Sequence, residues 1–173
     1  MVANKTRKLN RLDNQKMRTW ANFVISILLF TSCSSTKNIV GSDKDRKALE
    51  QTSIGIRSAF AKEDIPAILS YHHPKVKKAL GYKHLINGRE ELQKDLEGTF
   101  ANVKLTWLEN NVESLLFHNN TAIEMTAFTI EVTPKNGNKP FISKGRAMIV
   151  YIKSKQSPSG WSSIRELVQP ESE

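Results

Sequence analysis

The C-terminal part of the sequence restricts the fold most, because four strand-like runs follow one another there with only short breaks. The runs occupy residues 103–117, 121–133, 140–153 and 160–168. The breaks between them occupy residues 118–120, 134–138 and 154–159. These breaks are rich in Asn, Gly, Pro and Ser, which favour turns. Short connections make neighbouring strands antiparallel, so the sequence predicts a meander of four long strands.

Both faces of this predicted sheet carry apolar side chains in its central strands. One alternation set of the third run holds Met148, Val150 and Ile152, and the other holds Ala147, Ile149 and Tyr151. A sheet with one solvated face would show polar residues in one of the two sets. We therefore expect both faces to be covered, one by helices and the other by a second copy of the chain.

Three segments before the meander show helical spacing. Residues 43–63 place apolar side chains at intervals of three and four, with charges on the opposite face. Residues 64–71 predict a short second helix with Asp64 as its N-cap and Pro66 in its first turn. Residues 89–100 predict a third helix. Helices followed by an antiparallel meander indicate an α+β fold.

Glycine and proline mark two local features of this helical part. Gly55 lies inside the first helix, where it lowers helix propensity by about 1 kcal/mol relative to alanine, so we expect it to pack closely against a neighbour. Pro74 disfavours helical geometry at His73, so the second helix is expected to stop near residues 71–73. Residues 75–85 show a mixed pattern, with a short strand predicted at 82–86.

The N-terminal part reads as a secretory signal. Residues 20–30 are almost all apolar, follow a basic segment and precede small residues and the single cysteine, Cys33. The run is shorter than the roughly 20 residues that cross a bilayer. Residues 29–33, LFTSC, resemble the lipobox of bacterial lipoprotein signal peptides, which implies cleavage before Cys33 and lipidation of its thiol.

These observations predict three parts of the chain: a signal peptide at 1–32, a lipidated tether at 33–42 and one domain at 43–170. Residues 1–16 are either an unusually long basic n-region or sequence upstream of a start at Met17. An uncleaved N-terminal anchor and a short buried helix are the alternatives to the lipoprotein interpretation. A lipid anchor at Cys33 would place the protein at the bacterial cell envelope, on the periplasmic or outer-membrane face.

The charge balance argues against a nucleic-acid partner. The whole chain has a net charge of +9. Residues 1–32 hold six Lys and Arg and one Asp, so 33–173 carries 20 basic and 16 acidic residues, a net charge of +4. That value is ordinary for a soluble domain. The single cysteine also excludes an internal disulfide.

Four stretches resemble, in order, the SnoaL-like branch of the nuclear transport factor 2-like superfamily. They are AFAKEDIPAILSYHHP, INGREELQKDL, KGRAMIVYI and GWSSIREL, and the similarity extends over residues 48–170. The resemblance implies a cone, also called a cystatin-like fold, in which a strongly curved antiparallel sheet wraps around three N-terminal helices. It also implies a pocket inside the cone and often a dimer through the outer sheet face. Relatives include isomerases, cyclases, dehydratases and ligand-binding subunits.

One stretch departs from this family's pattern. Catalytic relatives commonly place an aspartate after the second helix or on a strand inside the cone. After its second helix this chain has Tyr71, His72, His73 and Pro74. His72 or His73, with Tyr71 or Tyr82 as partner, is therefore the candidate acid–base set. Capping or solvated roles are the alternative, because adjacent histidines point in different directions. With no spaced acidic partner, no metal centre and no cofactor are expected.

The candidate pocket residues come mainly from the strands. Tyr82, Trp107, Met125 and Phe128 either line an apolar cavity or belong to the ordinary core. If the set containing Met148 faces the cone, Arg146 is a buried cation for a carboxylate ligand or pairs internally with Glu124 or Glu131. Arg165 on the last strand has the same two roles, since a buried charge needs a partner.

Three functional hypotheses follow. The first is a lipid-anchored, homodimeric domain that binds a small, partly apolar ligand in the cone. The second is an isomerase, dehydratase or hydrolase that uses the histidine and tyrosine set. The third is a protein-interaction subunit that works through its outer sheet face.

Overall fold

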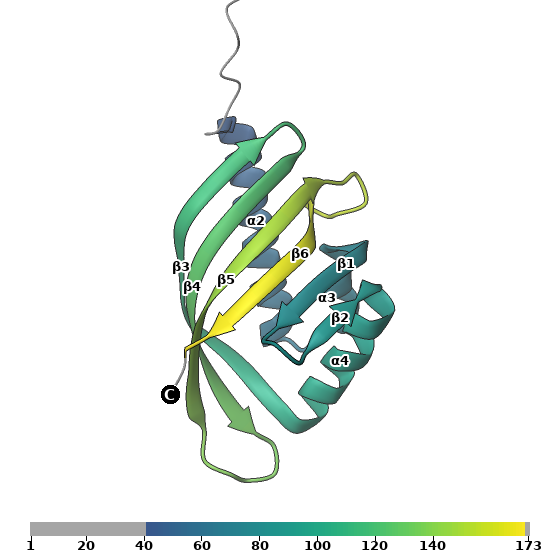
Figure 1. Cartoon of the computed structure of the whole chain (residues 1–173). Helices are drawn as coiled ribbons and strands as arrows, with labels where there is room; N and C mark the ends of the chain where they lie inside the picture. The colour runs from purple at the N-terminus through teal and green to yellow at the C-terminus, as the bar shows by residue number, and fades with distance from the viewer. Residues whose placement is uncertain (1–40, 172–173) are drawn as a thin grey trace, which may run out of the picture. The chain divides into compact units, whose positions relative to one another are not determined.

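The long first helix, α2 (Asp43–Ala61), begins at the N-cap Ser42, whose side chain accepts a hydrogen bond of 3.1 Å from the backbone N–H of Asp45. In this computed structural model of the chain, which describes residues 41–171, the helix lies behind the sheet in the view of Figure 1. It buries Leu49, Thr52 and Ala59. The helix predicted at 43–63 is confirmed.

Two shorter helices, α3 (Ile65–Ser70) and α4 (Gly88–Asn102), lie near the C-terminal end of α2 (Figure 1). Helix α3 is capped by Asp64, which accepts a 3.0 Å hydrogen bond from the backbone of Ala67, and it ends before Pro74 as predicted. Helix α4 buries three apolar residues on one face.

The four long strands form the predicted antiparallel meander. Their bounds are β3 (Val103–His118), β4 (Thr121–Pro134), β5 (Phe141–Lys153) and β6 (Trp161–Pro170). Two further strands, β1 (His72–Leu80) and β2 (Leu85–Asn87), complete a sheet with the order β2-β1-β6-β5-β4-β3. Strand β1 pairs parallel with β6, whereas β2 pairs antiparallel with β1.

Strand β1 is the main difference from the sequence-based expectation. Residues 75–85 were expected to be mixed and a strand was predicted at 82–86, but β1 runs through Leu80 and β2 starts at Leu85. The pairing of β1 with β6 shifts in register between His72 and Lys77, the interval that contains Pro74. Proline cannot donate to the ladder, so the sequence pattern of this strand is interrupted where its pairing is irregular.

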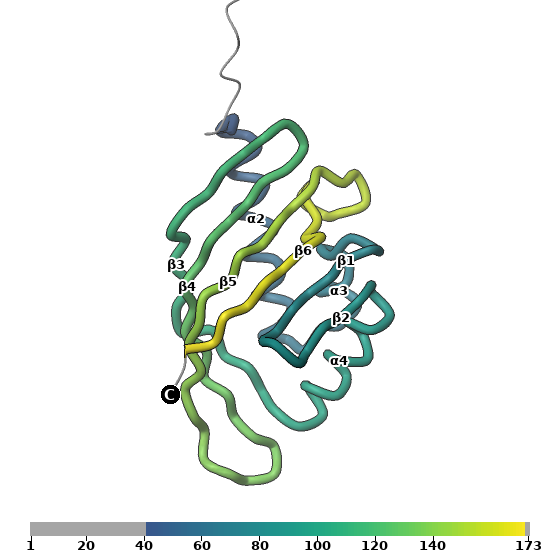
Figure 2. Tube along the Cα trace, in the orientation of Figure 1, coloured from purple at the N-terminus to yellow at the C-terminus, as the bar shows by residue number. Residues whose placement is uncertain are grey.

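The sheet curves strongly, which confirms the predicted cone (Figures 1 and 2). Register shifts occur in β3 between Trp107 and Glu109 and between Val112 and Ser114. A further shift separates Val150 from Tyr151 in the pairing of β5 with β6. Such bulges bend a strand and increase its twist, so they let the meander wrap around α2.

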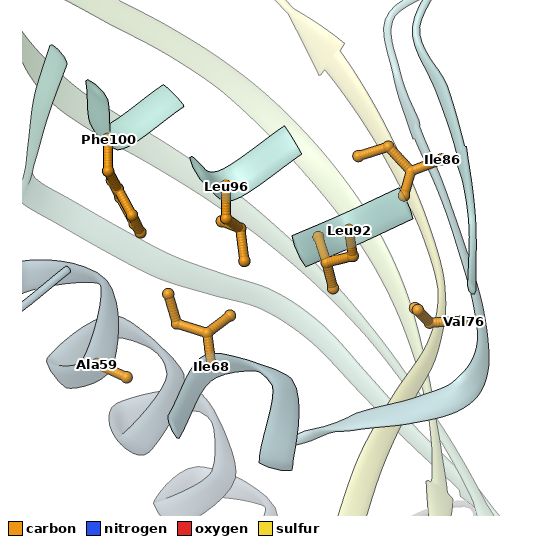
Figure 3. Close-up of a cluster of buried hydrophobic side chains, with 7 residues drawn as sticks. All are labelled: Ala59, Ile68, Val76, Ile86, Leu92, Leu96 and Phe100. Atoms are coloured by element: carbon orange, nitrogen blue, oxygen red, sulfur yellow. The ribbon is translucent and has the colours of Figure 1, made fainter. Parts of the chain in front are cut away.

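The buried apolar residues form two clusters. In Figure 3, Leu92, Leu96 and Phe100 lie in a line along α4 and face Ile68 of α3 and Ala59 of α2. The second cluster joins the N-terminal half of α2 to the meander through Leu49, Phe117, Ala122, Tyr151 and Trp161. Helix α2 therefore contributes to both clusters, which lie toward opposite ends of the sheet.

The outer sheet face carries exposed apolar side chains. They include Leu116, Ile123, Met148 and Leu167, with relative exposures between 38% and 53%. Cross-strand pairs such as Met148 with Leu167 make this surface continuous. Within residues 41–171 no element covers it, so its coverage by a second copy remains a prediction.

The predicted signal peptide at 1–32, Cys33 and nearly all of the tether at 33–42 lie outside the described residues. In the described part of the chain, no helix has the length and apolar character needed to span a membrane.

Candidate functional site

A pocket of about 290 Å³ lies between α2 and the concave face of the sheet. Helix α2 contributes Ser53, Ile56, Arg57 and Phe60, and strands β1, β3, β4, β5 and β6 contribute the other walls. Side chains alternate between the two faces of a strand, and the alternate residues Glu124, Thr126, Phe128 and Ile130 of β4 and Ala147, Ile149 and Tyr151 of β5 line this space. The pocket is the interior of the cone that the resemblance implied.

The sheet register brings charged residues from three strands into one row across this face. Glu124 on β4 pairs with Ile149 on β5, Ile149 pairs with Glu166 on β6, and Glu166 pairs with Lys78 on β1. All four line the pocket. The row therefore collects two carboxylates and one ammonium group from segments far apart in the sequence.

Lys78 and Glu166 form a buried ion pair. The distance from Lys78 Nζ to Glu166 Oε2 is 2.8 Å, and the side chains are only 8% and 16% exposed. Removing two charges from water is costly unless they are paired. The charges of Lys78 and Glu166 therefore compensate each other. Glu124, the other carboxylate of the row, has no ion-pair partner among the described residues.

Glu124 is buried and incompletely bonded. Its residue is 3% exposed, and its Oε1 atom has no hydrogen-bond partner in residues 41–171. Burial raises the pKa of Glu124, the positive charge of Arg57 opposes this rise, and the negative charge of Glu166 adds to it. Burying a carboxyl group without hydrogen-bond partners costs folding free energy. Residues with such a cost and a shifted pKa are typical of functional sites.

His72 is the second unusual polar group in the pocket. It is 1% exposed, and its Nδ1 lies 2.8 Å from the carbonyl oxygen of Ile68. Burial, together with the positive charge of Lys78, lowers the pKa of His72 to about 4. The ring is therefore neutral at pH 7, and because a carbonyl only accepts, Nδ1 carries the hydrogen. This tautomer leaves Nε2 with a lone pair.

Tyr151 and Ser163 carry two hydroxyl groups in a second row of paired residues, next to the row that contains Glu124 and Glu166. Tyr151 pairs with Ser163, and Ser163 pairs with His72. Ser53 of α2 also lines the pocket, and burial raises the pKa of Tyr151. The Ser163 Oγ atom is buried and has no partner in the described part of the chain.

The rest of the pocket is apolar and aromatic. Phe60 and Trp107 form an edge-to-face pair with a centroid distance of 5.1 Å. Phe128 and Ile130 continue this wall along β4. Successive residues on one face of a strand are about 6.6 Å apart, so the aromatic wall and the polar rows occupy different ends of the pocket.

The structure brings three of the sequence-predicted site residues into the pocket: Trp107, Phe128 and His72. His73 does not line it, and its Nδ1 accepts a 3.1 Å hydrogen bond from the backbone of Lys75. The two histidines therefore point in different directions, as expected.

Three other predicted residues lie elsewhere. Tyr82 is fully exposed, at 101%, in the turn between β1 and β2, so its assignment to the pocket is wrong. Met125 lies between Glu124 and Thr126 on β4, and because those two line the pocket, Met125 points to the outer face. Tyr71 packs its ring against Gly55 of α2 rather than into the pocket.

Arg146, Met148 and Arg165 were expected inside the cone but lie on its outer face. The set Ala147, Ile149 and Tyr151 lines the pocket, so the alternate residues of β5 face away from it. Arg146 makes two hydrogen bonds to Glu113, of 2.6 and 2.8 Å, and this contact holds the pKa of the Glu113 carboxyl below its usual value. Arg165 donates to the backbone oxygens of Lys75 and Ile164.

Sequence reasoning missed Glu124, Glu166, Lys78 and Ser163 as pocket residues. A signal existed for Glu124, because it alternates with Ala122, Thr126 and Phe128 in a set that is otherwise free of charge. No sequence signal marked Lys78 as a pocket residue, since it lies in a lysine-rich stretch that resembles a solvated strand. Among residues 41–171, no group of three or more His, Cys, Asp or Glu side chains is arranged to hold a metal ion.

No family model and no curated protein matches the sequence. Solved structures do match the fold. A conserved protein from Planctomyces limnophilus is 22% identical, with a TM-score of 0.67 over 75% of this chain and 100% of its own. A ketosteroid isomerase-like protein from Erwinia carotovora is 16% identical, with a TM-score of 0.67 over 76% of this chain and 100% of its own.

A nuclear transport factor 2-like superfamily protein from Salmonella enterica is also similar. It is 12% identical, with a TM-score of 0.60 over 75% of this chain and 92% of its own. Identities this low establish the architecture and leave the activity open. The chain has the α+β cone of the nuclear transport factor 2-like fold.

Proposed function

We propose that the domain binds a small, predominantly apolar ligand in the pocket of the cone, as a member of the SnoaL-like branch. One observation carries the proposal: a hollow of about 290 Å³ with aromatic walls contains a buried carboxyl group that no described residue satisfies. Ligand pockets are mostly apolar and hold a few convergent polar groups. A domain selected for stability alone would fill such a space.

The size of the pocket limits the ligand. Its volume lies at the lower end of the roughly 300–1,000 Å³ found for ligand sites, and an apolar cavity of about 150 Å³ already admits benzene. The ligand is therefore about the size of one or two fused rings.

An acid–base enzyme is the second candidate, and the state of Glu124 favours it. General acid–base catalysis works best with a pKa near the operating pH, and burial moves the pKa of Glu124 upward toward that range. Neutral His72 lies in the neighbouring row. An isomerase or dehydratase would use Glu124 to move the proton, whereas the sequence predicted His72 or His73 with Tyr71 or Tyr82 as partner.

Binding of a neutral fluorescent probe of two fused rings tests ligand binding. 1-Naphthylamine is titrated into the full-length chain and into two variants of adjacent residues on β5. Ala147→Phe fills the pocket, because Ala147 is 3% exposed and lines it, and should abolish the fluorescence increase. Met148→Phe changes the outer face and should bind as the wild type does. Equal binding by both variants, or none by the wild type, would contradict the proposal.

We also propose that residues 1–32 are removed and that lipidated Cys33 anchors the domain at the cell envelope. The order of a basic segment, an apolar run, small residues and a cysteine supports this. Cys33→Ser should leave an uncleaved precursor without lipid, as mass spectrometry would detect. A variant processed like the wild type would contradict the proposal.

A homodimer through the outer sheet face is the third part of the proposal. The exposed apolar strip that includes Met148 and Leu167 supports it. Sedimentation should show a dimer for the wild type and a monomer for the Met148→Lys, Leu167→Lys double variant. A monomeric wild type would contradict the dimer and favour a different protein partner on this face.

A further inference from the structure

The formal charges in the pocket cancel. Arg57 and Lys78 supply two positive charges, and Glu124 and Glu166 can supply two negative ones. A ligand with a net charge would disturb this balance in a place where water screens little. On the proposed function, from which this inference starts, the ligand is therefore neutral.

Two buried polar atoms among the pocket residues have no hydrogen-bond partner within residues 41–171, Glu124 Oε1 and Ser163 Oγ. Glu124 Oε1 has no partner among residues 41–171, and an ionised carboxylate only accepts. His72 uses Nδ1 toward Ile68 and keeps the Nε2 lone pair. Ser163 Oγ is also unpartnered, and it can donate or accept. A ligand group that satisfies Glu124 Oε1 must bring a hydrogen to donate, and Ser163 Oγ can donate to the oxygen of the same group.

The polar end is also the deeper end. Glu124, His72 and Ser163 are between 1% and 3% exposed. Phe60, Trp107 and Phe128 of the aromatic wall are only half-buried. A ligand that enters past the aromatic side chains therefore carries its polar group at the inner end, next to Glu124.

We infer that the ligand is a small cyclic alcohol whose hydroxyl group donates a hydrogen bond to Glu124 while its ring packs against Phe60, Trp107 and Phe128. A carboxylic acid would meet the two carboxylates of the row. A ketone of the same shape would bring no hydrogen, and a hydrocarbon would leave the Glu124 oxygen unsatisfied. Of these four compound classes, only the alcohol is neutral and can also donate a hydrogen bond to the unpartnered oxygen of Glu124.

Three compounds with one skeleton test this inference: indane, 1-indanone and 1-indanol. They differ only in lacking a polar group, carrying an acceptor, or carrying a hydroxyl group. Calorimetric titration of the full-length chain at neutral pH should show 1-indanol binding about tenfold more tightly than indane, the effect of one hydrogen bond to a charged group. The ketone should gain less than the alcohol, because it can accept from Ser163 Oγ but cannot donate to Glu124.

Two variants of β4 locate the effect. Glu124→Gln should remove most of the advantage of the alcohol while indane still binds, which also shows that the variant is folded. Glu131→Gln is the matched control, because Glu131 lies on the opposite face of the same strand, and it should keep the wild-type preference.

The outcomes separate the two proposals. If none of the three compounds binds and the fluorescent probe is not bound either, the proposed function fails. If indane binds but 1-indanol has no advantage, or 1-indanone binds most tightly, the pocket stands and the inferred alcohol is wrong. Retention of the full alcohol preference by Glu124→Gln would also overturn it.

Discussion

Glu124 combines a low contribution to stability with a position at the buried, polar end of the pocket. Its buried oxygen lacks a partner in the described part of the chain, and its pKa is raised by burial. Residues that reduce stability in this way are found preferentially at functional sites. The cost of burying this carboxyl group can be measured without knowing the ligand.

Glu124→Gln should raise the free energy of unfolding at pH 7. The folded-state pKa of Glu124 lies above its unfolded value of about 4.5. As the pH rises from the unfolded to the folded pKa, the unfolded chain loses the proton first, so the folded protein loses stability. Below about pH 4.5 the carboxyl group is protonated in both states and has no effect. Removing the charge should therefore stabilise by about 1 kcal/mol at pH 7, with a smaller gain at pH 4. Urea unfolding measures both values, and Glu131→Gln is the control. A loss of stability at pH 7 would contradict this view of Glu124.

His72 should make the protein less stable in mild acid. Its pKa is about 4 in the folded protein and near 6.5 in the unfolded chain. Between these values the unfolded state binds an additional proton, so stability falls as the pH drops through this window, by up to about 3 kcal/mol. Glu124 contributes with the opposite sign over part of the same range.

His72→Asn isolates the histidine contribution, because its amide can still donate to the Ile68 carbonyl while it does not titrate. Glu124 is present in both proteins, so the difference between their curves of unfolding free energy against pH belongs to His72. The variant should show the weaker loss of stability between pH 6.5 and 4. Identical slopes would contradict a buried neutral ring.

The two glycines inside helices illustrate how packing overrides helix propensity. A Cβ atom on Gly55 of α2 would collide with the hydroxyl group of Tyr71, whereas one on Gly98 of α4 would meet nothing within 4 Å. The close packing expected at Gly55 is confirmed. Sequence alone identified the need for it but not the partner.

Gly98→Ala and Gly55→Ala should therefore change stability in opposite directions. The first should stabilise by about 1 kcal/mol, the difference in helix propensity between the two residues. The second should destabilise, and in a Tyr71→Leu background it should do so less. Thermal unfolding of the wild type, the three single variants and the Gly55→Ala, Tyr71→Leu double variant measures this. Equal gains for both alanine variants would show that Tyr71 moves aside freely.

The elements were more predictable than their orientation. Turn composition located the meander, and N-caps with periodic apolar residues located the helices. The sequence did not predict which face of β5 points inward. Ala147 with Ile149 and Met148 with Val150 are equally apolar, so the alternation of residues alone cannot identify the inward set. The sequence-based prediction placed Met148 in the pocket, whereas Ala147, Ile149 and Tyr151 line it.

The site itself depended on pairing between distant segments. The parallel contact of β1 with β6 places Lys78 beside Glu166. No local pattern in the sequence signals a pairing across so many residues. The charged row could therefore be found only once the sheet register was known.

At the level of the molecule, the fold has a hollow middle between two packed clusters, and α2 contributes to both. A ligand in the hollow would add contacts to the helix and to the sheet. Binding to the folded state alone must raise stability, so occupancy should be visible as resistance to unfolding.

Saturation with 1-indanol should raise the free energy of unfolding. At a free concentration ten times its Kd, the increase should be about 1.4 kcal/mol. Ala147→Phe should show no increase, while Met148→Phe should behave as the wild type. An equal increase in all three proteins would place the ligand outside the cone.

A crystal structure of the full-length chain grown with 1-indanol would show the occupancy of the cone itself. We expect density for the ring between Phe60, Trp107 and Phe128, with its hydroxyl group within hydrogen-bond distance of Glu124. A cone filled by its own side chains, with the compound elsewhere or unbound, would contradict a ligand-binding role for this domain.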